Sequence, residues 1–333
     1  MSVPAFLRSR EAALALIIIA LVALIGWRAP VFVTPESLLG VLADTSFLFM
    51  LTLAQMAVIL TRGIDLSVAA NLALTGMIVA LVSRAHPEAP LVLIMLLATL
   101  IGLCLGLVNG AAIAFVGIPP IVVTLGTLAI FRGLIFVLAG GAWLTSKDMT
   151  PAFLAFPKAG LFGVSSLLWV AGIVALAFWL FLSFTQRGRA LYAIGGNPVA
   201  ARYCGVNLQT GQLLVYALSG AVAGLNGYLW VSRYGIAYSD IALGYELSVV
   251  AACVIGGVSI AGGIGTVAGA LLGALFLGVI VNALPVINVS PFWQMAISGA
   301  VILAAVIVNA RSERASGRLI LPEARRAQQS GGA

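Results

Sequence analysis

The chain has 333 residues, of which 62% are hydrophobic and only 8% are charged, whereas about a quarter of the residues of a soluble domain are charged. A water-soluble fold of this length could not bury so much apolar surface, so we predict a protein that lies in a lipid bilayer. The formal net charge is +7, and in a membrane protein the position of these charges matters more than their sum. Three scattered cysteines predict no disulfide framework or metal site, and a single histidine excludes a relay or metal cluster built from histidines.

The first apolar stretch, "EAALALIIIALVALIGW", follows basic residues and could be a cleaved signal peptide or a membrane span. It is longer than the usual apolar core of a signal peptide and has no clear small-x-small cleavage site before "RAPVF". We therefore interpret it as the first of ten spans, each near the length of about 20 residues that crosses the hydrocarbon. The ten lie roughly at residues 12–29, 45–61, 65–84, 91–115, 121–140, 165–184, 211–231, 245–260, 265–283 and 292–309, and only the Gly-rich "SIAGGIGT" divides the eighth from the ninth.

The basic residues support this count. With the N-terminus inside, ten spans place eleven of the seventeen Lys and Arg residues in the cytoplasm, five outside, and Arg132 within the fifth span. This distribution obeys the positive-inside rule, whereas nine or eleven spans would put the five tail arginines between Arg311 and Arg326 outside. We therefore predict an all-α polytopic membrane protein with about ten transmembrane helices and both termini in the cytoplasm.

Two stretches half a protein apart resemble each other: "GIDLSVAANLALTG" opens the third span, and "GYELSVVAACVIGG" opens the eighth. Five spans separate them, an odd number, so the copies have opposite orientations, as in an inverted-topology repeat. Chance similarity between apolar segments is the alternative. The matched residues are Asp65 and Ser67 in the first copy and Glu246 and Ser248 in the second. We expect each carboxylate to accept hydrogen bonds at a helix N-terminus, a structural rather than a catalytic role.

Glycines at steps of four support the repeat. Gly102, Gly106 and Gly110 lie in the fourth span, and Gly265, Gly269 and Gly273 lie in the ninth. Such small-xxx-small ridges allow the backbones of neighbouring helices to approach closely in lipid. We predict one transmembrane domain over residues 1–333, with a first half at about 12–184, a cytoplasmic loop at about 185–212, a second half at about 211–309 and a basic tail at 310–333.

The longest cytoplasmic stretch, "TQRGRALYAIGGNPVAARYCGVNLQTGQ", joins the two halves and contains its own helix signals. Asn197 is a good N-cap, Pro198 suits the first helical position, and Gly205 suits a left-handed stop. The helix between them could be only a connector. Because this loop is much longer than the other hairpins, a docking element for a soluble partner fits it better.

These stretches carry a resemblance to a known family. "GRALYAIGGNPVAARYCGVN", "TRGIDLSV", "PPIVVTLGTLAIFRG" and "PFWQMAISGAVILAAVI" are similar to the permease subunits of the ribose-type carbohydrate ABC importers, over roughly residues 34–309. Within the family the chain looks most like the branch assigned to rhamnose uptake, with autoinducer-2 and ribose permeases as neighbours. One departure is "SVAAN", where many relatives have Gly after Val.

The resemblance implies a permease of the bacterial inner membrane that pairs with an identical or homologous permease. Cytoplasmic ATPase subunits, which would bind ATP and Mg, would dock on the loop, and a periplasmic binding protein would deliver the sugar. The resemblance assigns the following residues to the docking loop: Arg187, Gly188, Arg189, Gly195, Gly196, Asn197, Pro198, Ala200, Ala201, Arg202 and Gly205.

The chain itself offers no nucleotide site. "GIGTVA" fits the dinucleotide fingerprint but joins two apolar helices, and the next acidic residue is distant. No G-x-x-x-x-G-K-[ST] sequence occurs, because the only lysines are Lys147 and Lys158, so we expect no cofactor on this chain and ATP hydrolysis on another polypeptide. The basic tail is expected to lie near anionic lipid, and it has no pattern typical of nucleic-acid binding.

Polar residues within the spans have two interpretations. An arginine at mid-helix costs about 2.5–3.5 kcal/mol on insertion scales, so Arg132 either lines the sugar path or binds carbonyls or a carboxylate between helices. The uncharged polar side chains could likewise bind a neutral sugar weakly or join helix to helix. Trp230 and Trp293 could stack on a sugar, although anchoring at the membrane interface is commoner. The candidate path comprises Asn71, Asn109, Thr124, Arg132, Asn282 and Gln294.

Two other classes of protein share some of these features. An ion-coupled carrier also uses inverted repeats, but it usually needs an ionisable residue or an unwound helix at midplane. The acidic residues here lie near the ends of spans, and the loop helix has no obvious use in such a carrier. An intramembrane enzyme would need a nucleophile, a metal ligand or a pair of carboxylates within the membrane, and none is convincing.

Overall fold

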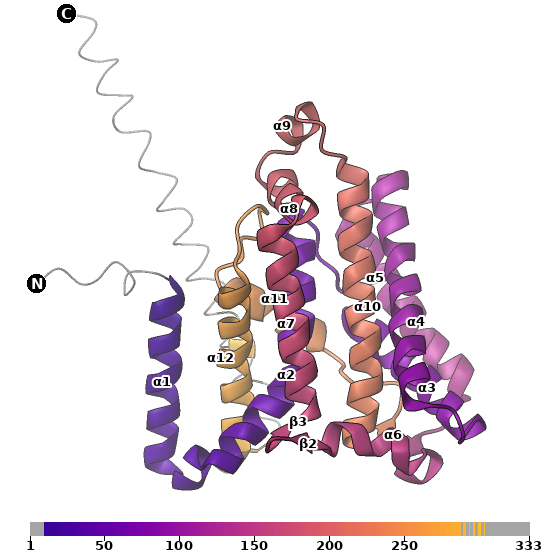
Figure 1. Ribbon diagram of the computed structural model, residues 1–333, viewed down its shortest axis with the longest axis vertical. Coiled ribbons are helices and arrows are strands. Elements are labelled where there is room, and N and C mark those ends of the chain that lie inside the picture. The colour runs from indigo at the N-terminus through magenta and orange to yellow at the C-terminus, as the bar shows by residue number, and fades with distance from the viewer. Residues whose placement is uncertain are drawn as a thin grey trace, which may run out of the picture.

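The computed structural model describes residues 10–287 and, beyond them, residues 289, 290, 293, 296, 299, 300 and 303. It is a bundle of long helices with short connecting elements (Figure 1). The α-helices are α1 (Arg10–Arg28), α2 (Pro35–Leu60), α3 (Val68–Ala85), α4 (Leu91–Ala111), α5 (Pro120–Ala139), α6 (Pro151–Ala155), α7 (Ser166–Phe184), α8 (Gln186–Gly196), α9 (Pro198–Tyr203), α10 (Leu208–Tyr234), α11 (Tyr245–Ile255) and α12 (Val267–Val286).

The connecting elements are small. A π-helical turn, η3 (Ala112–Val116), continues α4, and three short 3₁₀ turns are η2 (Pro30–Val33), η4 (Ser146–Asp148) and η5 (Phe156–Lys158). Strands β1 (Leu144–Thr145) and β4 (Ile236–Ala237) pair antiparallel, as do β2 (Gly160–Leu161) and β3 (Val164–Ser165). The β1–β4 pair ties the α5–α7 connection to the start of the α10–α11 connection.

The all-α polytopic class is confirmed, although the number of spans differs from the prediction. In the described part of the chain, eight helices are long and apolar enough to cross a membrane: α1, α2, α3, α4 with η3, α5, α7, α10 and α12. The predicted eighth span is α11, which has 11 residues and is therefore only about 16 Å long. It ends early because Gly256 caps it and Gly257 turns the backbone left-handed, with φ +86°. The predicted span at 292–309 falls largely outside the described residues.

Helix caps explain where two long helices begin. Thr34 accepts a hydrogen bond from the Ser37 amide at 3.4 Å, and Pro35 occupies the first turn, so α2 begins ten residues before the predicted span at 45–61. Asn207 accepts from the Thr210 amide at 3.0 Å and starts α10, which has 27 residues. Both helices therefore begin before the apolar stretches from which they were predicted.

Helices α2, α3 and α4 correspond in order to α10, α11 and α12, and each helix runs in the direction opposite to its counterpart. The α8 and α9 helices mark one end of the bundle (Figure 1). Helix α2 ends there, because Arg62 bonds to Gly195 of α8, and α12 begins there, because the Gly263 amide donates to the Leu60 carbonyl at 3.0 Å. Helix α10 also starts at this end, directly after α9.

The packing partners of the two helix sets are also exchanged. Helix α10 packs against α3 and α4, whereas α2 packs against α11 and α12, and α2 and α10 contact each other. Opposite directions and exchanged partners are the geometry expected of an inverted repeat.

The glycine ladders allow close packing, but their partners are not equivalent. A Cβ on Gly102 of α4 would collide with the backbone of Gly220 in α10, across the two helix sets. A Cβ on Gly269 of α12 would collide with Gly256, just after α11, within its own set. Close approach of backbones was therefore predicted correctly, whereas the pairing of the two ladders as symmetry mates differs from the observed packing.

Candidate functional site

The α8–α9 segment (residues 185–205) is a pair of capped helices at one end of the bundle. Thr185 accepts from the Gly188 amide at 2.9 Å and starts α8, which the sequence analysis did not predict. Asn197 accepts from the Val199 and Ala200 amides at 3.1 and 3.0 Å, and Gly205 follows α9 with φ +82°. The helix predicted between Asn197 and Gly205 is therefore confirmed, with Pro198 in its first turn.

Arg62 fastens this segment to the bundle. Its guanidinium Nε donates to the Gly195 carbonyl at 2.7 Å, and its Nη2 donates to the Gly196 carbonyl at 3.0 Å. These carbonyls lie at the C-terminus of α8, where a cation complements the helix dipole. Arg62 itself has a left-handed backbone, with φ +66°, a conformation that costs energy in a residue other than glycine. The two side-chain bonds help to hold it.

A second contact comes from the α11–α12 connection. The Tyr192 hydroxyl of α8 donates to the Gly265 carbonyl at 3.0 Å, and burial raises the pKa of this phenol, so it remains a donor. Gly195 has no room for a side chain, because a Cβ there would collide with the Leu60 carbonyl and the Gly263 amide. The α8–α9 segment therefore lies backbone against backbone on the end of α2 and on the α11–α12 connection.

The outer surface of the segment is free of other described parts of the chain. Helix α9 projects beyond the other helices (Figure 1), with Val199 65% exposed and Tyr203 90% exposed. An apolar, aromatic and basic surface of this kind is typical of a docking site. Of the residues assigned to docking, Arg187, Arg189, Gly196, Asn197, Ala200, Arg202 and Gly205 are exposed, Pro198 is half-buried, and Gly188, Gly195 and Ala201 are buried.

Asp65 follows Arg62 by three residues and lies in a buried hydrogen-bond network. Its Oδ1 accepts from the Ser67 amide at 3.0 Å and from the Ser67 hydroxyl at 2.7 Å, and its Oδ2 accepts from the Ser219 hydroxyl of α10 at 2.7 Å. Asn109 of α4 donates to the Ser67 hydroxyl at 2.8 Å. Asp65 therefore joins the start of α3 to α4 and α10 through hydroxyl and amide groups.

Two further residues of the candidate path also bond between helices. The Thr124 hydroxyl of α5 lies 3.0 Å from the Pro120 carbonyl of its own helix and 3.2 Å from the Ile64 carbonyl of the α2–α3 connection. Asn71 of α3 donates to the Gly102 carbonyl of α4 at 3.1 Å. Asn71, Asn109 and Thr124 are all buried. Their side chains bond to neighbouring helices or to residues just before α3 here, and their contact with a transported molecule stays a prediction.

The second copy of the motif has a different environment. Glu246 lies in the first turn of α11, and within the described part of the chain its carboxylate makes no hydrogen bond. Instead, its charge acts on Arg132 of α5, whose Nη1 donates to the Ser239 and Ile241 carbonyls at 2.7 and 2.8 Å. Arg132 thus fastens the α10–α11 connection to α5. The hydrogen bonds expected at both carboxylates are present only at Asp65.

The remaining candidates are dispersed. Ser248 of α11 and Asn282 of α12 line one cavity with Trp230, and the Asn282 amide donates to the Gly278 carbonyl at 2.8 Å. Gln294 lies outside the described residues. Three residues of the site, Arg62, Tyr192 and Ser219, were not predicted from the sequence. At "TRG", an arginine directly after an apolar span is a weak indication of a special role for Arg62. No residue near Ser219 in the sequence predicts its bond to Asp65.

Comparison with known proteins identifies the class. A profile of the family described as "Branched-chain amino acid transport system / permease component" matches residues 37–306, so the chain belongs to this family of membrane permeases. No solved structure matches it.

Three relatives illustrate the similarity. The ribose import permease protein RbsC of Escherichia coli (strain K12) is 35% identical over 311 residues, which is 93% of this chain and 96% of the relative. The galactose/methyl galactoside import permease protein MglC of the same strain is 34% identical, over 90% and 94% of the two chains. The autoinducer 2 import system permease protein LsrC of Salmonella typhi is 34% identical, over 91% and 86%.

Proposed function

We propose that this chain is the membrane-spanning subunit of an ATP-driven importer in the bacterial inner membrane, and that its cargo is a monosaccharide. The α8–α9 segment is the observation that carries the proposal, because it presents an exposed helix while its backbone is packed against the bundle. A force on α9 would reach α2 and α12 through the Arg62 and Gly195 contacts. The named relatives are permeases for ribose, galactose and autoinducer 2.

The partners follow from this role. A cytoplasmic ATPase, which binds ATP and Mg, would dock on the α8–α9 segment, and a periplasmic binding protein would deliver the sugar to the opposite face. A second permease, identical or homologous, would complete the membrane part. In this proposal residues 185–212 form the cytoplasmic docking loop between two membrane halves, and both termini lie in the cytoplasm. Arg62, Arg187, Arg189 and Arg202 gather at this end of the bundle, which supports the orientation.

Several compounds remain candidates for the transported molecule. Rhamnose rests on the resemblance alone, and ribose, galactose and autoinducer 2 are supported by the relatives. Uptake of each radiolabelled compound into proteoliposomes that contain the chain, its ATPase and its binding protein tests the proposal. We expect uptake of one of them that requires ATP and both partners. Uptake that follows an ion gradient without ATP would favour an ion-coupled carrier instead.

Docking can be tested separately with substitutions in the exposed surface. Arg189→Ala and Gly196→Val change exposed residues of the α8–α9 segment, so they are expected to weaken co-purification of the ATPase while leaving membrane insertion intact. A Cβ on Gly196 would meet no described atom within 4 Å, so a side chain can begin at this position without a collision. Unchanged co-purification in both variants would contradict the assignment of the docking surface.

A further inference from the structure

A cavity of about 220 Å³ lies between α2, α10, α11 and α12. Trp230 and Tyr234, at the C-terminal end of α10, form part of its wall, so it lies toward the end of the bundle opposite the α8–α9 segment. It is much larger than one water, which occupies about 30 Å³, and smaller than the pockets of about 300–1,000 Å³ that hold drug-sized ligands. The volume therefore suits a ligand of monosaccharide size.

One wall of the cavity is aromatic. The Trp230 ring lies 5.2 Å from the Tyr234 ring and 5.2 Å from the Tyr245 ring, and Phe47 supports it from behind at 5.0 Å. Within the described residues, the indole N–H of Trp230 and the hydroxyls of Tyr234 and Tyr245 form no hydrogen bond. This wall therefore combines fixed apolar ring faces with unused donors and acceptors.

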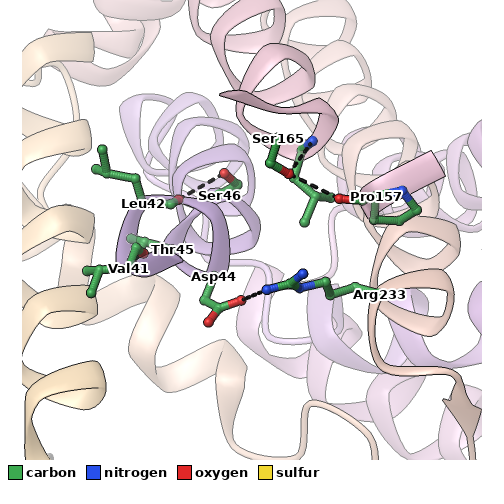
Figure 2. A network of polar contacts seen from close by, with 9 residues as sticks. Val41, Leu42, Asp44, Thr45, Ser46, Pro157, Ser165 and Arg233 are labelled. Atoms are coloured by element: carbon green, nitrogen blue, oxygen red, sulfur yellow. Dashed lines mark hydrogen bonds and ion pairs between the residues drawn. The ribbon is translucent and has the colours of Figure 1, made fainter. Parts of the chain in front are cut away.

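Other lining residues add polar groups, and the charged one among them, Asp44, is paired with an arginine outside the lining. Asp44 of α2 accepts from Arg233 of α10 at 3.0 Å, and Figure 2 shows the two side chains pointing toward each other. This pair uses Asp44 Oδ1, so Oδ2 remains available as an acceptor. The Asn282 amide bonds only to its own helix, which leaves its Oδ1 available, and the Ser248 hydroxyl is unused within the described residues.

We propose that this cavity is a binding subsite for a neutral polyol of monosaccharide size, an inference that rests on the proposed function. Aromatic faces pack against the C–H groups of a sugar ring, while several separate donors and acceptors suit its hydroxyls. Because the Asp44–Arg233 pair is neutral overall, the cavity favours a neutral ligand over an ion. The subsite draws on both halves of the chain, since α2 belongs to the first and α10–α12 to the second.

Occupancy would also affect the contact between the halves. Asp44 lines the cavity and is 34% exposed, so a ligand hydroxyl could reach its carboxylate and compete with Arg233, which lies outside the lining. Binding would then change the bond that joins α2 to α10 at this end of the bundle. The subsite is therefore placed where ligand binding and the relative position of the two halves are linked.

Binding to the full-length chain alone, in lipid nanodiscs, tests the subsite. The probes are D-ribose, D-galactose and L-rhamnose, each titrated separately and followed by saturation-transfer NMR and by tryptophan fluorescence. Ser248→Leu fills the cavity, and Ser183→Leu, at an exposed position of α7, is the matched control. We expect saturable binding of at least one sugar, weakened about tenfold or more by Ser248→Leu and unchanged by Ser183→Leu.

A second, smaller substitution controls for misfolding of Ser248→Leu. Asn282→Ala removes the available Oδ1 acceptor together with an amide group that bonds only within α12, and it should weaken binding roughly three- to tenfold. Saturable binding that neither Ser248→Leu nor Asn282→Ala changes would overturn the subsite, as would a phospholipid acyl chain found in the cavity. If no sugar binds the permease while the reconstituted importer still takes one up, the subsite is wrong and the proposed function stands. If a sugar binds as described but no ATP-dependent uptake occurs, the subsite stands and the proposed function fails.

Discussion

The two copies of the Gly-x-acid-Leu-Ser-Val motif share a sequence and differ in chemistry. Asp65 is buried and accepts three hydrogen bonds from Ser67 and Ser219. Glu246 is partly exposed, makes no hydrogen bond within the described part, and faces the charge of Arg132. The first copy lies beside the α8–α9 segment, and the second lies at the opposite end of the bundle.

This difference shows what an inverted repeat preserves. The repeat fixes the directions and partners of the helices, whereas each end of the bundle adapts its polar groups to its own task. At the α8–α9 end, the backbones are in close contact and are joined by the hydrogen bonds of Arg62 and Gly263, which suits a part that transmits force. At the other end, one arginine fastens the α10–α11 connection, and a cavity with unused polar groups lies nearby. Substitutions at the two ends should therefore differ in size.

The largest effect is expected at Gly195. Gly195→Ala would place a methyl group against backbone atoms of Leu60 and Gly263, which cannot rotate away. We expect a loss of about 3 kcal/mol in the free energy of unfolding, with loss of ATPase binding. Unfolding in detergent, followed by circular dichroism, measures the first quantity. Gly172→Ala in α7, where a Cβ would meet no described atom within 4 Å, is the control and should change little.

The next effect compares the two motif copies directly. Asp65→Ala leaves the Ser67 and Ser219 hydroxyls and the Ser67 amide without their buried acceptor, so we expect a loss of about 2–3 kcal/mol. Glu246→Ala removes no hydrogen bond that the described residues make, and its cost should stay within about 0.5 kcal/mol. Parallel unfolding measurements on the two variants decide the matter. Equal losses would contradict the difference between the two ends.

A smaller effect is expected at Arg62. Arg62→Ala removes two bonds to the α8 carbonyls from a partly exposed position, so we expect a loss of about 1–2 kcal/mol. Arg62→Lys keeps the charge but cannot reproduce both bonds, so it should recover only part of this loss. ATP hydrolysis by the assembled transporter should become less dependent on the binding protein in both variants. Full coupling in Arg62→Ala would exclude Arg62 from the transmission of force.

The smallest effect concerns the α5–α7 connection. Asp148 accepts from the Thr145 amide at 2.9 Å and from its hydroxyl at 3.1 Å, and these bonds hold the pKa of the carboxyl below its usual value. Its contribution is therefore fully present above the usual pKa of about 3.9 and fades as the pH falls through the lower folded value. Thermal unfolding against pH should show a slight loss of stability in acid that Asp148→Asn lacks. An identical acid response in this variant would place the effect elsewhere.

The sequence allowed much of the fold to be predicted, because long apolar stretches and basic residues specify membrane spans directly. Helices α3, α5, α7 and α12 begin and end within a few residues of their predicted bounds. The length of α11 was predicted wrongly, because apolar composition continues past Gly256 and Gly257, where the helix already ends. Composition reports solubility in lipid, whereas the end of a helix depends on the backbone conformation of single residues.

The candidate site was less predictable. Helix α9 could be predicted from Asn197, Pro198 and Gly205, because helix caps are local and depend on neighbours in sequence. The contacts of Arg62 with Gly195 join residues 133 positions apart, and no local pattern specifies such a pair. The same reason explains why the cavity near Trp230 was not predicted, since four helices supply its walls.

The most direct test of the account is the side of the membrane that the α8–α9 segment faces. Cys204, which caps α9, is exposed, and Cys253 is buried, so Cys104→Ser leaves one reactive thiol. A membrane-impermeant maleimide should label Cys204 in inside-out vesicles and not in intact spheroplasts, and bound ATPase should slow the reaction. Labelling of Cys204 from the outside of intact spheroplasts would contradict a cytoplasmic docking segment and with it the proposed mechanism.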